Sequence, residues 1–288
     1  MNLLTSFLLG IIQGLTEFIP ISSTAHLLIG QTLLGIPSDD ATFAFLVIVQ
    51  LGTLVSLIVY FWKDLWEILR AMSSPLSYHK PHDAEEEDNE AYKKRKRLAA
   101  NARIGWCILI ATIPALLAGY VLKDEVKRLF HQPLTEAAIR LFAAAFLLLL
   151  AELVSKRSRR LHTITSLDAV VIGMYQVLAV FPGASRSATA ISGGMLRSFH
   201  RRSAARFAFL MSVPVMLAAG GFEMLEVLRT PDLNNFLLPM AVGFVTAGVI
   251  GWFVVKWLLG YLTRHSLYPF AAYCAVVGVI CLLLPRLL

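Results

Sequence analysis

The residues best suited to chemistry lie in an interrupted apolar stretch near the N-terminus, residues 10–30. This stretch contains one carboxylate, one imidazole and three neighbouring hydroxyls: Glu17, His26, Ser22, Ser23 and Thr24. An ionisable side chain that leaves water for hydrocarbon is costly, so it usually serves a function. A carboxylate beside hydroxyls and an imidazole can bind a cation or activate a nucleophile. We therefore interpret this stretch as the first part of a functional site.

A second interrupted apolar stretch, residues 173–194, contains a pattern suited to phosphate. Residues 182–187 read PGASRS, which combines a turn, two hydroxyls, a helix start and an arginine. Arg186 cannot lose its charge, and its guanidinium fits a phosphate with two parallel hydrogen bonds. The alternative, that Arg186 extends to the membrane surface, explains poorly a base with apolar runs on both sides. The phosphate-binding residues that we expect here are Gly183, Ser185, Arg186 and Ser187.

Gln13 and Glu17 lie four residues apart on an expected helix, so their side chains share one face. They can address a cation together, although an interhelical hydrogen bond explains Gln13 equally well. A carboxylate and an arginine in one cavity suit a phosphate ester with a divalent cation, because Mg²⁺ is commonly held by carboxylates and substrate phosphates. We therefore predict a divalent cation, Mg²⁺ or Ca²⁺, with Glu17 and Gln13 as its protein ligands.

The hydroxyls of Ser22, Ser23 and Thr24 also have a simpler interpretation as helix caps. A cap needs only one of them, so we expect Ser22 and Thr24 to bind substrate as well. His26 lies one turn into the same helix, where a single histidine is often only a packed core residue. Its place beside Glu17 and Ser23 favours a catalytic role.

The composition is that of a polytopic membrane protein. Of the 288 residues, 57% are hydrophobic and only 16% are charged, unlike an ordinary soluble domain. The net charge of +7 does not indicate a nucleic-acid partner, because the bases cluster in short segments between apolar runs, as membrane topology explains. The cysteines, Cys107, Cys274 and Cys281, lie in apolar segments at no metal-site spacing, so no disulfide framework is expected.

Two half-length hairpins and six full spans account for the apolar residues. Pro20 interrupts the first stretch, where a helix does not continue, and we expect re-entrant helix hairpins at 2–35 and 166–198. Each half of a hairpin is shorter than the roughly 20 residues of a full span. The expected spans are 41–62, 104–122, 134–154, 204–228, 236–260 and 267–285. A polar segment at about 71–102, acidic and then basic, is interpreted as a solvated cytoplasmic loop.

The two hairpins resemble each other, which indicates an internal repeat. The span after each hairpin opens with Phe-Ala-Phe-Leu, at 43–46 and at 207–210. We divide the chain into a first repeat, 1–155, and a second, 163–288, each all-α with one hairpin and three spans. Because three is odd, the second repeat has inverted topology. The basic loops then fall on one side, which the positive-inside rule makes cytoplasmic.

At these motifs the chain resembles the bacterial undecaprenyl-diphosphate phosphatase family, also known as bacitracin-resistance proteins. Residues 13–26 are similar to the glutamate-rich signature of that family, and residues 182–187 are similar to its PGxSRS motif. The resemblance implies hydrolysis of undecaprenyl diphosphate to the monophosphate, which recycles the lipid carrier for cell-wall synthesis and confers bacitracin resistance. It also implies dependence on a divalent cation, a place in the bacterial inner membrane and a site that opens to the periplasmic face.

Carried over residue by residue, the resemblance gives Glu17 an acidic catalytic role and gives Arg186 the contact with phosphate. It makes Ser23 and His26 the two candidate nucleophiles. The first acidic position of the signature is Gln13 in this chain, and the family pattern accepts either residue. We favour His26 as the nucleophile, because an unaided serine is the weaker of the two.

A rival interpretation belongs to a different class of protein. Broken helices that meet in inverted repeats also form transporter sites, so the same residues could serve a lipid-phosphate flippase or an anion carrier. Release of phosphate in detergent, where no second compartment exists, distinguishes an enzyme from a transporter. The expected partners are a polyprenyl diphosphate lipid and the bilayer, with no nucleic acid, and we also consider a homodimer.

Overall fold

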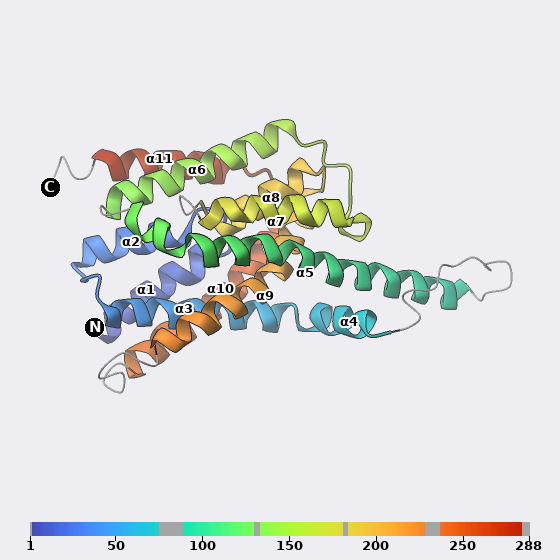
Figure 1. Cartoon of the computed structure of the whole chain (residues 1–288). Coiled ribbons are helices and arrows are strands. Elements are labelled where there is room, and N and C mark those ends of the chain that lie inside the picture. Colours follow the sequence, from blue (N-terminus) through green and yellow to red (C-terminus); the bar gives the residue numbers. More distant parts are fainter. Residues whose placement is uncertain (1, 75–88, 130–132, 181–183, 228–236, 284–288) are drawn as a thin grey trace.

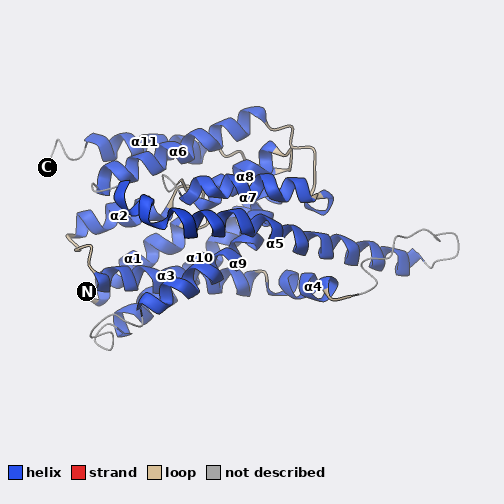
Figure 2. Cartoon of the chain, viewed as in Figure 1, coloured by secondary structure: helices blue, strands red, loops and turns tan. Residues whose placement is uncertain are grey.

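The protein is a bundle of α-helices, and the residues described by its computed structural model include no β-strand. Those residues are 2–74, 89–129, 133–180, 184–227 and 237–283. Figure 2 shows helices joined mostly by short loops. The all-α fold expected from the sequence is therefore confirmed.

The helices divide between the two halves of the sequence. The first half contains α1 Leu3–Thr16, α2 Ser23–Leu34, α3 Asp40–Tyr60, α4 Trp62–Met72, α5 Asn89–Leu129 and α6 Pro133–Val154. The second half contains a 3₁₀ turn at Leu161–Thr163 and then α7 Ser166–Val180, α8 Arg186–Leu196, α9 Arg201–Val227, α10 Leu237–Tyr261 and α11 Tyr268–Leu283. In Figure 1 the N-terminal part of α5 extends beyond the rest of the bundle.

Among the described residues, five helices are long and apolar enough to cross a membrane. They are α3, Glu90–Leu122 within α5, α6, Arg201–Leu225 within α9, and α10. These helices confirm five of the six spans expected from the sequence. The sixth corresponds to α11, whose 16 described residues are fewer than the roughly 20 of a full crossing. The chain is a multi-pass membrane protein.

The polar segment expected as a loop at 71–102 is partly helical, so that prediction was wrong for residues 89–102, which belong to α5. Residues 75–88 lie outside the described part of the chain. Lys93 donates to Glu90 at 2.9 Å, one turn away on this solvent-exposed part of the helix. Pairs at this spacing stabilise an exposed helix, whereas the loop prediction considered only the density of charge.

Two short helix pairs, α1–α2 and α7–α8, occupy the positions expected for the hairpins. The first pair is broken at residues 17–22 and the second between Val180 and Arg186. At the first break Ser22 has a φ of +69°, a left-handed conformation that is uncommon for a residue other than glycine. Such a conformation persists only where the surrounding structure holds it, and it occurs often at functional sites.

Each hairpin packs its first helix against a long helix from the other half of the chain. Helix α1 packs on α10, and α7 packs on α5. Glycines permit these close approaches: a Cβ on Gly14 would lie 2.9 Å from the backbone oxygen of Ala247, and one on Gly173 would lie 2.6 Å from that of Ala111. Small residues at such crossings are typical of membrane bundles. The partner helices therefore fix the position of each hairpin.

A buried carboxylate joins the two helices of the second hairpin at the end away from the break. Asp168, in the first turn of α7, is fully buried. Its Oδ2 accepts a hydrogen bond from Arg159 at 2.6 Å, and its Oδ1 accepts one from Arg197, just after α8, at 2.7 Å. A buried charge is tolerated when it is paired and hydrogen-bonded in this way. The two ends of the α7–α8 pair are therefore joined.

The glycine contact beneath the second hairpin predicts a clear effect on stability. Gly173→Ala should lower the free energy of unfolding by about 1–3 kcal/mol, because the new methyl group must push α7 away from α5. The melting temperature in detergent measures this loss. Gly119→Ala is the matched control, since a Cβ there meets no atom within 4 Å. Equal melting temperatures for the two variants would contradict the close packing of α7 on α5.

Candidate active site

The carboxylate of Glu17 stands where the two broken helices meet. Its Oε1 accepts a hydrogen bond from Arg186 Nη2 at 2.8 Å, across 169 positions of the sequence. Its Oε2 accepts one from Ser23 Oγ at 2.7 Å and one from Gln13 Nε2 at 3.0 Å. The Glu17 side chain is only 5% exposed. The structure therefore brings together four residues that the sequence identified. Gln13 and Glu17 come from the α1 side of the first break, Ser23 from its α2 side and Arg186 from the second hairpin.

The interruption of the helix after α1 places Ser23 next to Glu17. Helix α1 ends at Thr16, and the backbone N–H of Glu17 still bonds to Gln13 O at 3.0 Å, so the carboxylate continues the Gln13 face of the helix. The left-handed Ser22 then turns the chain, so that α2 begins at Ser23. The Ser22 side chain makes no capping hydrogen bond, so the interpretation of Ser22 as a side-chain cap is not supported. Ser23 is free to serve Glu17 instead.

The hydroxyls of the second hairpin hold the α8 N-terminus against the first break. Ser185 Oγ accepts from the backbone N–H of Ala188 at 3.3 Å, which caps α8, and lies 2.9 Å from Ser187 Oγ. Ser187 Oγ in turn donates to the backbone oxygen of Ile19 at 3.3 Å. Arg186 begins α8 and extends to Glu17 with its side chain 28% exposed. Gly183, the remaining residue expected to bind phosphate, lies outside the described residues.

His26 is tied to two groups other than Glu17. Its Nδ1 lies 2.9 Å from the backbone oxygen of Ser22, and its Nε2 lies 2.8 Å from the hydroxyl of Tyr273. A carbonyl oxygen only accepts, so Nδ1 carries the proton and the neutral ring accepts from Tyr273 at Nε2. The two rings are nearly parallel, with an angle of 8° between them. No hydrogen bond joins His26 to Glu17 within the described residues.

Tyr273 is the residue of this site that sequence reasoning missed. It lies on α11, 247 positions from His26, in an apolar run with no other polar side chain near it in the sequence. No local pattern distinguishes it from a tyrosine that packs against lipid. Only the tertiary contact reveals its partner.

The outer edge of the site is open, whereas its base is closed. Thr24 is exposed and Ser23 and His26 are half-buried, while Gln13 and Glu17 are buried. Thr24 has no hydrogen-bond partner from its side chain among the described residues. It therefore remains available to a ligand that approaches from the exposed edge.

The oxygen atoms of the site fit a cation that is held jointly by protein and phosphate. Gln13 Oε1 is buried and has no hydrogen-bond partner, an expensive arrangement that an additional donor or cation relieves. Within the described residues there is no cluster of three or more His, Cys, Asp or Glu residues that could hold a metal alone. Glu17 and Gln13 offer two oxygens, so waters and phosphate oxygens would supply the others, as is common for Mg²⁺.

Comparison of the sequence with known proteins identifies the family of this chain. The family model described as "Bacitracin resistance protein BacA" matches residues 6–280, a range that contains the breaks in both helix pairs. The chain belongs to the BacA family.

Curated relatives of this BacA-family chain are similar over nearly their whole length. The undecaprenyl-diphosphatase of Anaeromyxobacter dehalogenans (strain 2CP-1) is 38% identical over 282 residues, covering 96% of this chain and 90% of that protein. The undecaprenyl-diphosphatase of Chloroherpeton thalassium is 38% identical, covering 97% of this chain and 95% of that protein. The one of Prochlorococcus marinus is 35% identical, covering 96% and 89%. The range matched by the family model spans the positions of all the site residues.

The ion pair between Glu17 and Arg186 predicts a particular pattern of stability. Arg186→Gln should destabilise the protein by about 3 kcal/mol, because it leaves a buried carboxylate unpaired. Combining it with Glu17→Gln should restore most of the loss, since the double variant has no buried charge. Melting temperatures of both single variants and the double variant in detergent measure the coupling. Additive losses in the double variant would show that the two side chains do not interact.

Proposed function

We propose that this chain is an integral membrane phosphatase that hydrolyses undecaprenyl diphosphate to undecaprenyl phosphate and inorganic phosphate. The observation that carries the proposal is that one buried carboxylate, Glu17, accepts from the Ser23 hydroxyl and from the Arg186 guanidinium at once. A nucleophile and a phosphate-binding arginine thereby both contact the same base. Family membership and the names of the relatives support the lipid substrate, and with it a role in carrier recycling and bacitracin resistance.

Ser23 is the residue that we assign as the nucleophile, in place of His26. The sequence argument against serine was that an unaided hydroxyl is weak. Ser23 Oγ donates to a buried carboxylate at 2.7 Å, so it is not unaided. His26 Nε2 carries the lone pair that would attack, and the hydroxyl of Tyr273 already donates to it. His26 and Tyr273 then serve to orient the substrate head group at the open edge.

The reaction proceeds in two displacements at the terminal phosphorus. Glu17 takes the proton of Ser23 Oγ as this oxygen bonds to phosphorus, and the bond from phosphorus to the bridging oxygen breaks. Undecaprenyl phosphate leaves with that electron pair and receives the proton from Glu17. The ionised Glu17 next takes a proton from the water that attacks the phosphoserine and returns it to Ser23 Oγ, which releases inorganic phosphate. The transfers to and from Ser23 Oγ use an oxygen that already contacts Glu17 at 2.7 Å.

The second hairpin stabilises the negative charge on the transferring phosphoryl group. Arg186 moves one guanidinium edge from Glu17 to the phosphate oxygens, which its partial exposure permits. The α8 N-terminus adds amide donors and a partial positive charge. Ser185 and Ser187, with Ser22, Thr24 and Gly183, complete the substrate-binding set. Positioning and charge stabilisation supply most of the catalysis in such reactions.

A divalent cation, Mg²⁺ or Ca²⁺, is part of the proposal. Glu17 and the unsatisfied oxygen of Gln13 would hold it, together with oxygens of the diphosphate. Bound there, it would supply positive charge that neutralises the diphosphate and polarises its phosphorus. The chemistry of proton transfer stays with Ser23 and Glu17.

The inverted repeat and the membrane orientation also belong to this proposal. The reciprocal packing of α1 on α10 and α7 on α5 supports two related halves, 1–155 and 163–288, with hairpins re-entering from opposite faces. In such an arrangement the broken ends meet inside the membrane. The basic loops would face the cytoplasm by the positive-inside rule. The site would then open to the periplasmic face of the bacterial inner membrane.

Phosphate release from undecaprenyl diphosphate in detergent tests the proposed activity. Glu17→Gln, Ser23→Ala and Arg186→Ala should each lower turnover by at least about 100-fold, because each removes a group that acts on the transition state. His26→Ala should lower it by about tenfold, as expected for an orienting group. Glu136→Gln and Ser212→Ala are matched controls, since within the described residues Glu136 pairs with Arg140 on α6 and Ser212 with Ala208 on α9.

Two outcomes of this assay would contradict the assignment. Retained turnover in Ser23→Ala with complete loss in His26→Ala would make the imidazole the nucleophile. Absence of phosphate release by the folded wild-type protein would exclude the enzyme and leave the transporter interpretation.

The role of Gln13 can be measured without turnover. Mn²⁺ is a paramagnetic substitute for Mg²⁺, and its electron paramagnetic resonance signal reports the free ion. Gln13→Leu should weaken Mn²⁺ binding by about tenfold in the presence of a diphosphate, because one of two protein oxygens is lost. Gln31→Leu, also buried but on α2 and away from Glu17, should leave it unchanged. Equal binding by wild type and Gln13→Leu would remove Gln13 from the ligand set.

A further inference from the structure

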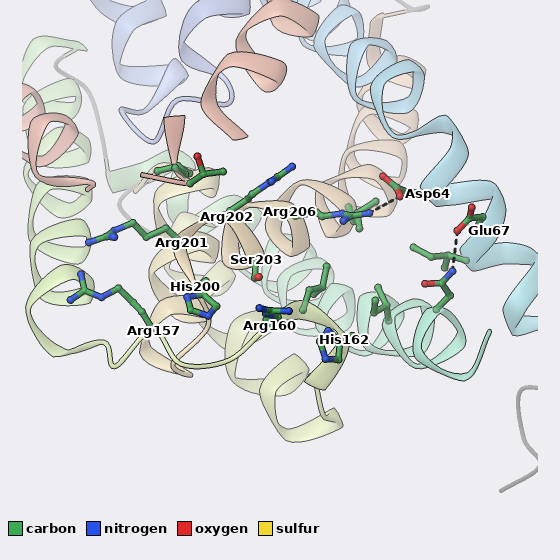
Figure 3. Close-up of a pocket in the computed structure, with 17 residues that line it drawn as sticks. Asp64, Glu67, Arg157, Arg160, His162, His200, Arg201, Arg202, Ser203 and Arg206 are labelled. Atoms are coloured by element: carbon green, nitrogen blue, oxygen red, sulfur yellow. Dashed lines mark hydrogen bonds and ion pairs between the residues drawn. The ribbon is translucent and has the colours of Figure 1, made fainter. Parts of the chain in front are cut away.

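A second concave region lies at the end of the bundle that carries the basic loops, and it shares no residue with the Glu17 site. This open cavity, with a volume of about 730 Å³, is within the range of small-molecule sites. Its walls come from α4, the N-terminal parts of α5 and α9, the segment before α7 and the end of α10. Figure 3 shows arginine and histidine side chains gathered around it.

The charge of the cavity wall is strongly positive. Its arginines are Arg157, Arg160, Arg201, Arg202 and Arg206, and its carboxylates are only Asp64 and Glu67. Both carboxylates are already occupied, since Arg206 donates to Asp64 at 2.6 Å and Arg97 donates to Glu67 at 2.8 Å. The wall therefore has positive charge that its own acids do not compensate.

The arginines of the wall differ in whether a carboxylate pairs with them. Arg157 and Arg201 both donate to Glu152, at 2.7 Å and 2.6 Å. In contrast, Arg160 and Arg202 have no carboxylate partner within the described ranges, and both are exposed to the cavity. They come from different elements, the segment before α7 and the first turn of α9. Two guanidinium groups of this kind suit a ligand with two negative charges.

Neutral donors beside these arginines favour a phosphoryl group over a carboxylate. Ser203, in the first turn of α9, also lines the cavity. The first backbone hydrogen bond of α9 is from Ala204 N–H to His200 O, so the preceding amides have no partner within the helix. A tetrahedral anion with several acceptor oxygens can use the arginines, the hydroxyl and these amides together. A carboxylate has too few oxygens to do so.

We propose that this cavity binds a phosphoryl dianion, either a soluble diphosphate or the phosphate head group of a lipid, through Arg160, Arg202 and the N-terminus of α9. The positive-inside rule explains basic loops, but it requires only net charge on one side. It does not require unpaired arginines from separate segments to line one cavity. Binding here is independent of hydrolysis at Glu17, because no residue of that site lines the cavity.

The test compares two double variants that remove the same charge. Arg160→Gln with Arg202→Gln removes the cavity arginines, whereas Lys156→Gln with Arg264→Gln removes exposed bases that do not line the cavity. Both are made in an Arg186→Ala background, so that the Glu17 site contributes little affinity for phosphate. One arm titrates inorganic diphosphate by calorimetry, and the other counts bound phosphatidic acid by native mass spectrometry. The arm that gives binding identifies the source of the phosphoryl group.

The expected result is at least about tenfold weaker binding for the cavity variant in one arm, since each lost guanidinium removes a charge-assisted hydrogen bond. The control variant should change by less than about twofold, as expected for exposed charges. Equal weakening by both variants would overturn the proposal, because it would indicate only a diffuse field. Absence of saturable binding in both arms would overturn it as well. Phosphate release by the cavity variant with Arg186 intact should equal that of wild type. If the cavity proposal fails, the proposed phosphatase activity therefore still stands.

Discussion

A single buried carboxylate determines how this membrane protein is organised. Glu17 lies at the point where α1 ends, in surroundings where an unpaired charge would be costly. The cost is met by three donors that reach it from α1, α2 and α8. A single continuous helix could not supply them, because only its residues three or four positions away share a face with Glu17. Both helices must therefore be broken, and their broken ends must meet.

The rest of the bundle holds the broken ends together. Each hairpin rests on a long helix from the other half of the chain, at crossings where glycine lets the backbones approach closely. Asp168 pairs with two arginines and so joins the ends of the second hairpin that lie away from its break. This support lets Ser22 hold its left-handed conformation and lets the Gln13 oxygen stay without a hydrogen bond. Without the support, both groups would move to more favourable arrangements. Rigid surroundings and a polar, unsatisfied centre are what phosphoryl transfer requires.

The sequence predicted the helices better than it predicted the contacts between side chains. Polar side chains inside apolar stretches marked Glu17 and Arg186, since the membrane makes them expensive, and Pro20 marked the first break. Contacts at long range gave no such signal. Tyr273 is one tyrosine on an apolar helix, and only the fold brings it to His26. The preference for His26 as nucleophile rested on residue types alone, because the geometry that lets Ser23 donate to Glu17 cannot be calculated from spacing. The helical start of α5 was missed because its charge suggested a loop.

The central claim is that Glu17 makes Ser23 the attacking group, and trapping of the covalent intermediate tests it most directly. Undecaprenyl diphosphate labelled at the terminal phosphate is mixed with enzyme, and the reaction is stopped within one turnover in acid and, separately, in alkali. Phosphoserine survives acid and phosphohistidine survives alkali, so peptide sequencing of the labelled protein identifies the residue. The account predicts acid-stable label on Ser23 that is absent from Glu17→Gln. Alkali-stable label on His26 would contradict it.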